Sequence, residues 1–233
     1  MSDPLDEIRR AAFELRQTDP QEAVRVLRRA AAGGGDAEVL ARGALGEIYL
    51  EEFADLDGAE HEFREVLRLA PGLSAAELGL ARVLREQGDV QRADAGLERA
   101  LLGIARDVQG FRDSEEEELP PGAEEVVLTL LEVANELGDL RSAHGSDNAV
   151  KVPLDESLLV WAESERLLDV TEDADDWVRF YSLWTQLRLL TGRGEEAIAA
   201  IASAHLPEAD RAGLLAEVRA ELGLPVLVTL GKP

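Results

Sequence analysis

The sequence predicts an all-α protein, an α-solenoid of stacked antiparallel helix pairs, and three observations support this fold class. Two consecutive segments of 35 and 34 residues, between Val39 and Asp107, repeat one pattern of small, aromatic and turn residues. Apolar residues recur at helical spacing along most of the 233-residue chain. Hydrophobic residues make up 45% of the chain and aromatic residues only 4%, which favours a continuous core of Ala and Leu contacts. A repeat of this length is typical of helix pairs that stack on one another.

The two copies share the same order of features. In the first copy a small residue and an aromatic residue come before the turn, and small and large apolar residues follow it: Leu45-Gly46, Tyr49, a turn at Asp57-Gly58, Ala59, Phe63, Val66 and Pro71. The second copy reads Leu80-Ala81, Leu84, a turn at Gly88-Asp89, Ala93, Leu97 and Ala100. Small residues at these positions let two helices approach closely.

This pattern resembles the tetratricopeptide repeat (TPR) family, whose loose signature is Leu-Gly, Tyr, Ala, Phe and a closing Pro. The first copy carries one extra residue in its turn, and the second has Ala81 in place of the usual Gly. The resemblance implies a right-handed solenoid that serves as a protein-binding scaffold. It also implies that the first helix of each pair lines a concave groove.

Weaker copies of the pattern extend to both ends of the chain. Residues Pro4 to Ala37 predict a helix pair, with Asp19-Pro20 opening its second helix. Further along, the pattern predicts a first helix over 124–137 with a turn at Gly138-Asp139, a resumed helix over 154–168, a last pair over 177–204 and a capping helix over 206–222. The turn of the last pair is expected at Gly192-Arg193-Gly194.

We therefore divide the chain into four parts. They are N-terminal TPR-like repeats (1–107), an acidic Pro-containing linker or loop (108–123), degenerate repeats with an inserted loop at 142–155 and a capping helix (124–222), and an apolar C-terminal tail (223–233). The tail is expected to fold back over the last helix, and self-association would follow if it docked on a second copy instead.

The net charge of −24, from 48 acidic and 24 basic residues, predicts repulsion from nucleic acid and from anionic membrane surfaces. It favours a basic partner, while a general solubility role is the preferred explanation for most of the charge. No segment is long and apolar enough to cross a bilayer, the first ten residues do not form a secretory signal, and there is no cysteine. These features predict a cytoplasmic protein.

The residues favour no enzyme activity: we expect no catalytic residues, no metal and no cofactor. His61, His144 and His205 lie in different repeat units, and Glu65 stands where a second zinc-binding histidine would follow His61. The Gly-rich segments Gly33-Gly34-Gly35 and 192–194 lie between helices and lack the preceding strand of a phosphate-binding loop. We interpret both as turns.

The resemblance to the TPR family places seven residues in the concave groove: Glu47, Leu50, Arg82, Arg85, Glu132, Asn135 and Gln186. Arg82 and Arg85 would form a basic centre between acidic flanks. Chaperone-type members of the family use a Lys and Asn clamp, but Gly43 and Glu47 occupy the corresponding positions here, so that activity is not expected. A second candidate is an acidic loop that is either a hinge or a docking site for a basic peptide: Asp113, Glu115, Glu116, Glu117 and Glu118.

The function expected from the sequence is therefore a non-enzymatic scaffold or adaptor that holds a peptide or extended segment of a partner in the groove. Two alternatives remain open. One is an acidic assembly or secretion chaperone for a basic client, and the other is a regulatory module that senses a small ligand.

Overall fold

The computed structural model describes residues 4–114, 120, 122–144, 150–164, 174–204 and 206–224. These residues are helices and connecting segments, with no strand among them. The chain forms two compact units, Met1–Gly103 and Ile104–Pro233, whose boundary falls within one long helix. Each unit is described separately below.

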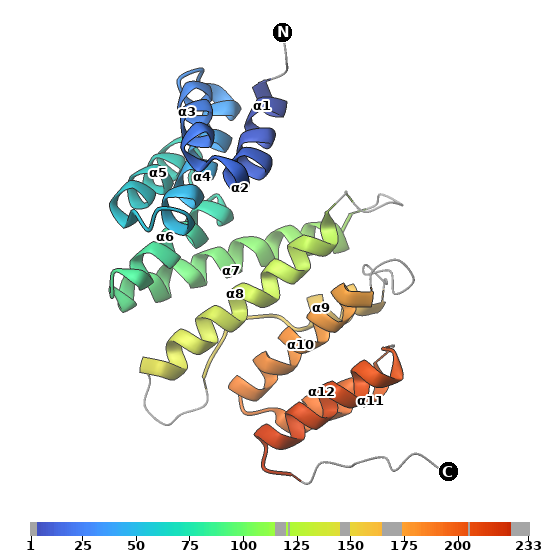
Figure 1. The fold of residues 1–233 in the computed structure, drawn as a ribbon. Helices are drawn as coiled ribbons and strands as arrows, with labels where there is room; N and C mark the ends of the chain where they lie inside the picture. Colours follow the sequence, from blue (N-terminus) through green and yellow to red (C-terminus); the bar gives the residue numbers. More distant parts are fainter. Residues whose placement is uncertain are drawn as a thin grey trace. The chain divides into compact units, whose positions relative to one another are not determined.

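The first unit is built of three helix pairs (Figure 1). Its helices are α1 (Pro4–Arg10), η1 (Ala11–Leu15), α2 (Arg16–Thr18), α3 (Pro20–Ala31), α4 (Gly35–Glu51), α5 (Leu56–Leu69), α6 (Ser74–Glu86) and the start of α7 (Val90–Arg112). The segments α1, η1 and α2 follow one another without a break, and together they form the first helix of the first pair. Neighbouring helices pack in chain order, α3 with α4, α4 with α5 and α5 with α6. The first helices also contact one another, α1 with α4 and α4 with α6. The predicted solenoid of helix pairs is confirmed.

Small residues in the repeat pattern allow this close packing. The Phe63 ring of α5 is 3% exposed and lies against Gly46 of α4 and Gly79 of α6. A Cβ atom would come within 2.8 Å of that ring at Gly46 and within 2.4 Å at Gly79. One aromatic ring thus occupies space that two glycines leave open, and it joins one helix pair to the next.

The helix ends follow local capping rules, with one difference from the sequence-based prediction. Asp55 Oδ1 accepts a hydrogen bond from the Gly58 N–H at 3.0 Å, so α5 begins at Leu56 and Asp57-Gly58 lie in its first turn. The prediction of a turn at Asp57-Gly58 is therefore wrong, because Asp55 is the better N-cap. The predicted turn at Gly88 is confirmed: Gly88 has a φ of +81°, which favours glycine.

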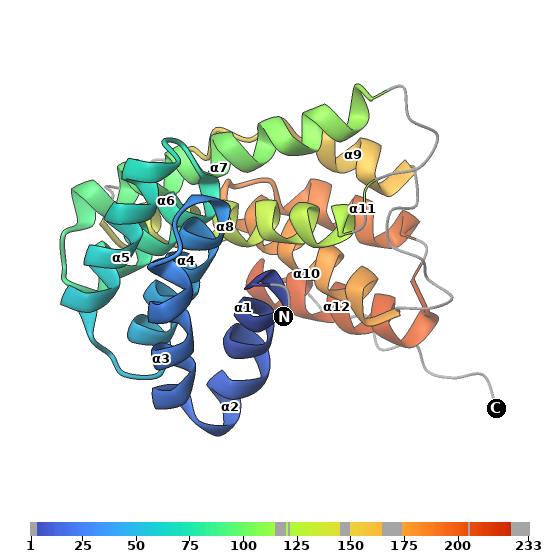
Figure 2. The same cartoon turned by 90° about the horizontal axis from the view of Figure 1, so that it is seen from above.

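The described residues of the second unit form the end of α7 and five further helices. They are α8 (Ala123–His144), α9 (Ser157–Ser164), α10 (Ala174–Leu190), α11 (Gly194–Ser203) and α12 (Glu208–Glu221). Helix α10 packs against both α8 and α11, and α11 packs against α12 (Figures 1 and 2). The expected last pair and the helix that follows it are present, and Gly192, with a φ of +77°, makes the turn between α10 and α11.

The predicted turn at Gly138-Asp139 is wrong. Helix α8 continues through both residues to His144. Gly138 is buried, and a Cβ atom there would lie 3.0 Å from Leu190 Cδ1 and 3.6 Å from Val152 Cγ2. The glycine therefore allows α10 and the segment before α9 to pack closely against α8, and it does not break the helix.

An aromatic cluster fills the core beside α10. The Phe180 ring centroid lies 5.4 Å from those of Tyr181 and Trp184, both in edge-on geometry. Trp184 is buried, as its predicted packing position requires. Trp161 is half-buried on α9, and the Trp177 side chain lies outside the described residues. This core holds α10 against its neighbours.

Candidate functional site

The first helices of three consecutive pairs bring charged side chains to one face of the first unit, which we call the first-helix face. It comprises Arg16 of α2, Glu47 and Leu50 of α4, and Arg82 and Arg85 of α6. Arg16 Nη1 lies 3.6 Å from Glu47 Oε2, and the Arg82 charge acts on the same carboxylate. Glu47 thus stands between cations from the pair before it and the pair after it.

Arg16 is shared by three carboxylates of α4. Its Nε donates to Glu52 Oε1 at 2.9 Å, its Nη2 donates to Glu51, and Glu47 completes the set. Partial burial lowers the pKa of Arg16, but the hydrogen bonds and charges of the three glutamates outweigh it and leave the pKa above its usual value. One guanidinium facing three carboxylates leaves an excess of negative charge at this end of the face.

The sequence-based reasoning missed Arg16, although a signal for it exists. Ala11 and Leu15 are four residues apart, whereas the matching residues Ala81 and Leu84 are three apart. The π-helical segment η1 takes up this extra residue, so that Arg16, directly after Leu15, matches Arg85, directly after Leu84. Counting the additional residue would have placed Arg16 on the first-helix face.

Glu47 has an unusual electrostatic setting. Burial of its carboxylate is the largest effect and raises the pKa of Glu47, and the neighbouring Glu51 carboxylate raises it too. The charges of Arg16 and Arg82 lower it, but the pKa remains above its usual value. The side chain nevertheless remains 55% exposed, so water screens much of this effect. Glu47 is therefore recessed among protein atoms but open to a partner.

A pH titration tests this arrangement. We expect the side-chain carboxyl carbon of Glu47, followed by NMR, to titrate above its usual value of 4.5. Because the pKa of Glu47 is raised in the folded state, its ionised form slightly destabilises the fold. This destabilisation should be lost as the pH falls through the titration midpoint of the folded protein. Replacing Arg16 by Gln should move the midpoint further up, and Glu51→Gln should move it down. A midpoint that both substitutions leave unchanged would contradict the proposed coupling.

The two arginines of α6 have different surroundings. Arg85 Nε lies 3.9 Å from Glu86 Oε1, and its side chain is 38% exposed. Arg82 is half-buried, and its charge lowers the pKa of Glu47. Glu47 and Arg82 thus interact between neighbouring first helices, with carboxylates concentrated on α4 and guanidiniums on α6.

The expected groove residues of the second unit have three different settings. Glu132 of α8 accepts a hydrogen bond from Arg179 Nη2, and Arg179 Nη1 also lies 3.5 Å from Glu125 Oε2. Asn135 is only 4% exposed, and its amide donates to the carbonyls of Leu131 and Leu183, each at 2.9 Å. Gln186 is exposed on α10. Asn135 therefore joins α8 to α10 within the core and does not line a surface.

Only one residue of the expected acidic loop can be described. A hydrogen bond from Arg112 lowers the pKa of Asp113, whose carboxylate lies 3.1 Å from Arg112 Nε. Glu115, Glu116, Glu117 and Glu118 lie outside the described residues. In the expected insertion at 142–155, the first three residues extend α8, residues 145–149 are outside the described part, and residues 150–155 are not helical.

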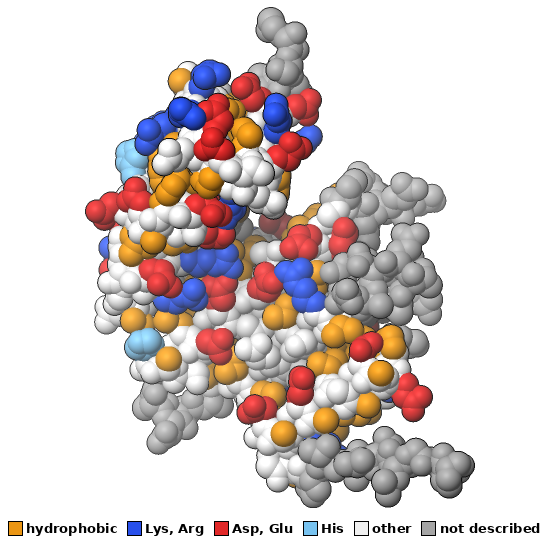
Figure 3. Space-filling view, in the orientation of Figure 1, with side chains coloured by type: hydrophobic (Ala, Val, Ile, Leu, Met, Phe, Trp, Pro, Cys, Tyr) orange, Lys and Arg blue, Asp and Glu red, His pale blue; other side chains and the backbone are white. Residues whose placement is uncertain are grey.

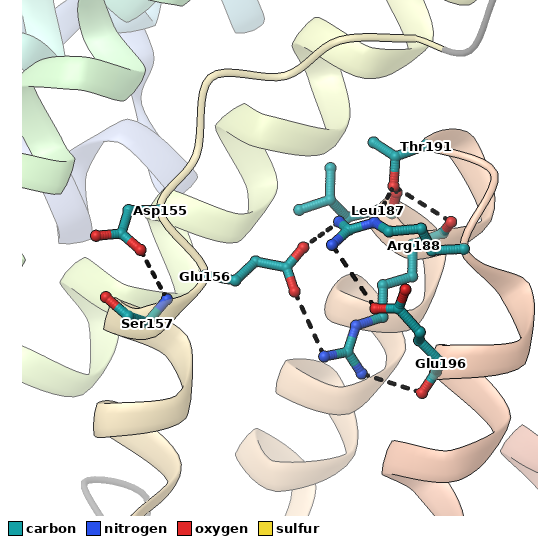
Figure 4. A network of polar contacts seen from close by, with 8 residues as sticks. Asp155, Glu156, Ser157, Leu187, Arg188, Thr191 and Glu196 are labelled. Atoms are coloured by element: carbon teal, nitrogen blue, oxygen red, sulfur yellow. Dashed lines mark hydrogen bonds and ion pairs between the residues drawn. The ribbon is translucent and has the colours of Figure 1, made fainter.

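The residue that directly follows that insertion is paired with the last helix pair (Figure 4). Glu156 pairs with Arg188 at 3.4 Å and also with Arg193. Arg193 lies 3.9 Å from Glu196, and the Arg188 guanidinium stacks on Trp184, 4.2 Å from the ring centroid. This network was not anticipated from the sequence, because its partners come from separate segments.

The negative charge is unevenly divided between the two units. Residues 1–103 contain 21 acidic and 13 basic residues, whereas residues 104–233 contain 27 and 11. In Figure 3, acidic and basic side chains alternate over α3 to α6, while acidic side chains predominate over the described helices of the second unit. The second unit therefore carries most of the excess charge.

Within the described ranges, no group of three His, Asp or Glu side chains could hold a metal ion. His61 and His144 are exposed on α5 and α8, and His205 is outside the description. None of the described helices has the length and apolar character needed to span a membrane. The Gly-rich segments are turns, as predicted: Gly34 and Gly35 have φ values of +77° and +66°.

No protein-family model and no curated protein sequence matches this chain. Solved structures do match it along almost its whole length. A structure of the assembly chaperone of RpL4 (Acl4), residues 1–338, is 20% identical, covers 95% of this chain and 85% of its own, and superposes with a TM-score of 0.57. A Podosopora anserina putative kinesin light chain with nearly identical TPR-like repeats is 17% identical, with 96% and 98% coverage and a TM-score of 0.51.

The fold is that of the TPR-like helical repeats. A second structure of the same kinesin light chain, with the Q17M substitution, is again 17% identical, covers 96% of this chain and 97% of its own, and has a TM-score of 0.51. At these identities the likeness shows the architecture alone. The site must therefore be argued from the residues of this chain.

Proposed function

We propose that this protein is a non-enzymatic scaffold or adaptor that binds an extended segment of a partner protein on the first-helix face. The observation that carries this proposal is the convergence of Arg16, Glu47 and Arg82 from three consecutive first helices. Charges on neighbouring first helices can contact different residues of one extended chain. Affinity would come from a few anchor side chains and specificity from charge placement.

The TPR-like fold supports this proposal, because stacked helix pairs present elongated surfaces to other proteins. Leu50 adds a half-buried apolar contact beside Glu47, and Arg85 extends the basic part of the face. An acidic side chain or C-terminal carboxylate of the partner would pair with Arg82 and Arg85 through charge-assisted hydrogen bonds. In the second unit, Glu132 and exposed Gln186 are proposed as further contacts.

Affinity capture from a native lysate tests the proposal. The full chain is compared with an Arg82→Glu/Arg85→Glu variant, and bound proteins are identified by mass spectrometry. We expect one or more partners to bind the wild type and to be reduced at least tenfold on the variant, because two attractive charges become repulsive. The matched control, Arg25→Glu/Arg29→Glu, makes the same charge change on α3, a second helix, and should retain the partners. Equal binding to all three proteins would contradict the proposed face.

A second candidate is an acidic assembly chaperone for a basic client. The charge excess of the second unit favours it, and one structural neighbour is an assembly chaperone of RpL4. In the same capture experiment, such a client would stay bound to both variants and would be released steeply by salt, since long-range attraction between exposed charges is screened. A groove partner would instead be lost on the Arg82→Glu/Arg85→Glu variant.

A further inference from the structure

Helix α4 carries a stripe of partner-accessible side chains on the first-helix face. Leu40, Gly43, Glu47 and Leu50 are spaced by three or four residues, so they share one side of the helix. Leu40 is 52% exposed, so its apolar side chain is accessible to a partner. We call these four residues the α4 stripe.

Gly43 makes a gap in this stripe. Nothing lies within 4 Å of the position that its Cβ atom would occupy. On the same helix, Gly46 is required by the Phe63 ring, but no contact within the protein requires a glycine at 43. Glycine weakens a helix interior relative to alanine. The missing side chain leaves room on the outer surface between Leu40 and Glu47, where the bulky group of a partner can be seated.

The charge beside this gap is negative. Glu47 and Glu51 are both more than half exposed. With Glu52 they share the Arg16 guanidinium, and the Arg82 charge also acts on Glu47, so three carboxylates face two guanidiniums. Burial of its carboxylate is the main cause of the raised pKa of Glu47, and the Glu51 charge adds to it. A cation placed over Glu47 would therefore be favoured, whereas an acidic group would be repelled.

We propose that the α4 stripe binds a partner segment in which a bulky apolar residue is followed, two positions later, by Lys or Arg. The apolar side chain occupies the gap over Gly43, and the cation pairs with Glu47. The spacing follows from geometry: four residues of α-helix rise about 6 Å, and alternate side chains of an extended chain are about 6.6 Å apart. This inference rests on the proposed function, and it specifies the chemistry of the segment that the first-helix face holds.

Selection from a phage-displayed library of random ten-residue peptides tests this specificity. Parallel selections use the full-length wild type, Gly43→Leu, Gly43→Ala, Glu47→Arg and Arg82→Glu/Arg85→Glu, with Gly213→Leu and Glu217→Arg as matched controls. Gly213 is a helical glycine of α12 that likewise has open space around it, and Glu217 is an exposed glutamate of the same helix. Sequencing before and after selection gives the enrichment of each residue pair at each spacing.

We expect the pair of a bulky apolar residue and Lys or Arg two positions later to be enriched on the wild type and on both controls. Gly43→Leu should reduce that enrichment at least tenfold, because the new side chain fills the gap. Gly43→Ala, which fills little of it, should retain most of the enrichment and shows that the loss is not due to misfolding. On Glu47→Arg, the selected peptides should be enriched in Asp and Glu at the second position of the pair, in place of Lys and Arg.

Other outcomes overturn the inference in distinguishable ways. Enriched peptides that lack this pair but are lost on Arg82→Glu/Arg85→Glu would leave the proposed function standing and reject the α4 stripe. Enrichment of the pair that Gly43→Leu and Glu47→Arg leave unchanged would likewise reject the stripe as its site. Peptides that bind every variant equally, or no enrichment at all, would reject both the stripe and the first-helix face.

Discussion

Phe63→Ala should lower the free energy of unfolding of the first unit by about 3–5 kcal/mol, the usual cost of removing a buried phenylalanine. The Phe63 ring fills space against Gly46 of one pair and Gly79 of the next, so its loss opens a cavity that neither glycine can fill. Denaturant unfolding followed by far-UV circular dichroism measures the change. Phe13→Ala is the matched control: Phe13 is 71% exposed, and its removal should cost less than about 0.5 kcal/mol.

Intrinsic fluorescence shows which unit is affected. Trp161, Trp177 and Trp184 all belong to the second unit, so tryptophan emission reports on that unit. We expect Phe63→Ala to lower the denaturant concentration at which the first unit unfolds, as followed by circular dichroism. The midpoint of the tryptophan fluorescence transition should not change. A double-mutant cycle with Gly79→Ala adds a second check, because the alanine should be costly beside Phe63 and tolerated beside Ala at 63. Additive effects of the two substitutions would contradict the packing argument.

Glu156→Gln should destabilise the second unit by about 2–3 kcal/mol, somewhat less than for a fully buried ion pair. Glu156 is the carboxylate partner of Arg188, whose side chain is only 11% exposed, and it also pairs with Arg193. A neutral amide would leave the largely buried Arg188 guanidinium without its counter-charge. Trp184 stacks on Arg188, so tryptophan fluorescence during denaturant unfolding measures the effect directly.

The control for this prediction is Glu125→Gln in the same unit. Glu125 is 62% exposed, and Arg179, its partner, retains Glu132, so the expected cost is below about 0.5 kcal/mol. A Glu156→Leu/Arg188→Met double variant should recover part of the stability lost by Glu156→Gln, because replacing both charges by apolar groups leaves neither one unpaired. Equal costs for Glu156→Gln and Glu125→Gln would show that the network contributes little.

Most of the fold could be predicted from the sequence, because the repeat pattern depends on residues that are close together in the chain. Gly46, Tyr49 and Phe63 stand at spacings that specify two packed helices, and Gly88 marks a turn through its own positive φ. The last pair and the helix that follows it were predicted from the same local periodicity. Such features depend on backbone preferences and helical spacing, which act over one or two turns.

The site was predicted less completely than the fold. Glu47 and Arg82 interact between neighbouring first helices. The place of Leu50 and Arg85 in the groove, and the part of all four residues in binding, stay predictions. Arg16 was missed, because a single additional residue in a π-turn shifts the register. Asn135 was expected in the groove, but α10 covers it, and this burial depends on Leu183, which is 48 residues away in the chain.

The glycines show where local sequence rules end. Gly88 and Gly138 look alike in the sequence, each followed by Asp, yet the first makes a turn and the second lies buried within α8. What distinguishes them is Leu190, whose side chain reaches Gly138 from another helix. Helical periodicity and turn chemistry thus define the repeat from the chain alone. The contacts that bury Gly138 and Asn135 and gather three glutamates around Arg16 exist only after folding, because they join side chains that are distant in sequence.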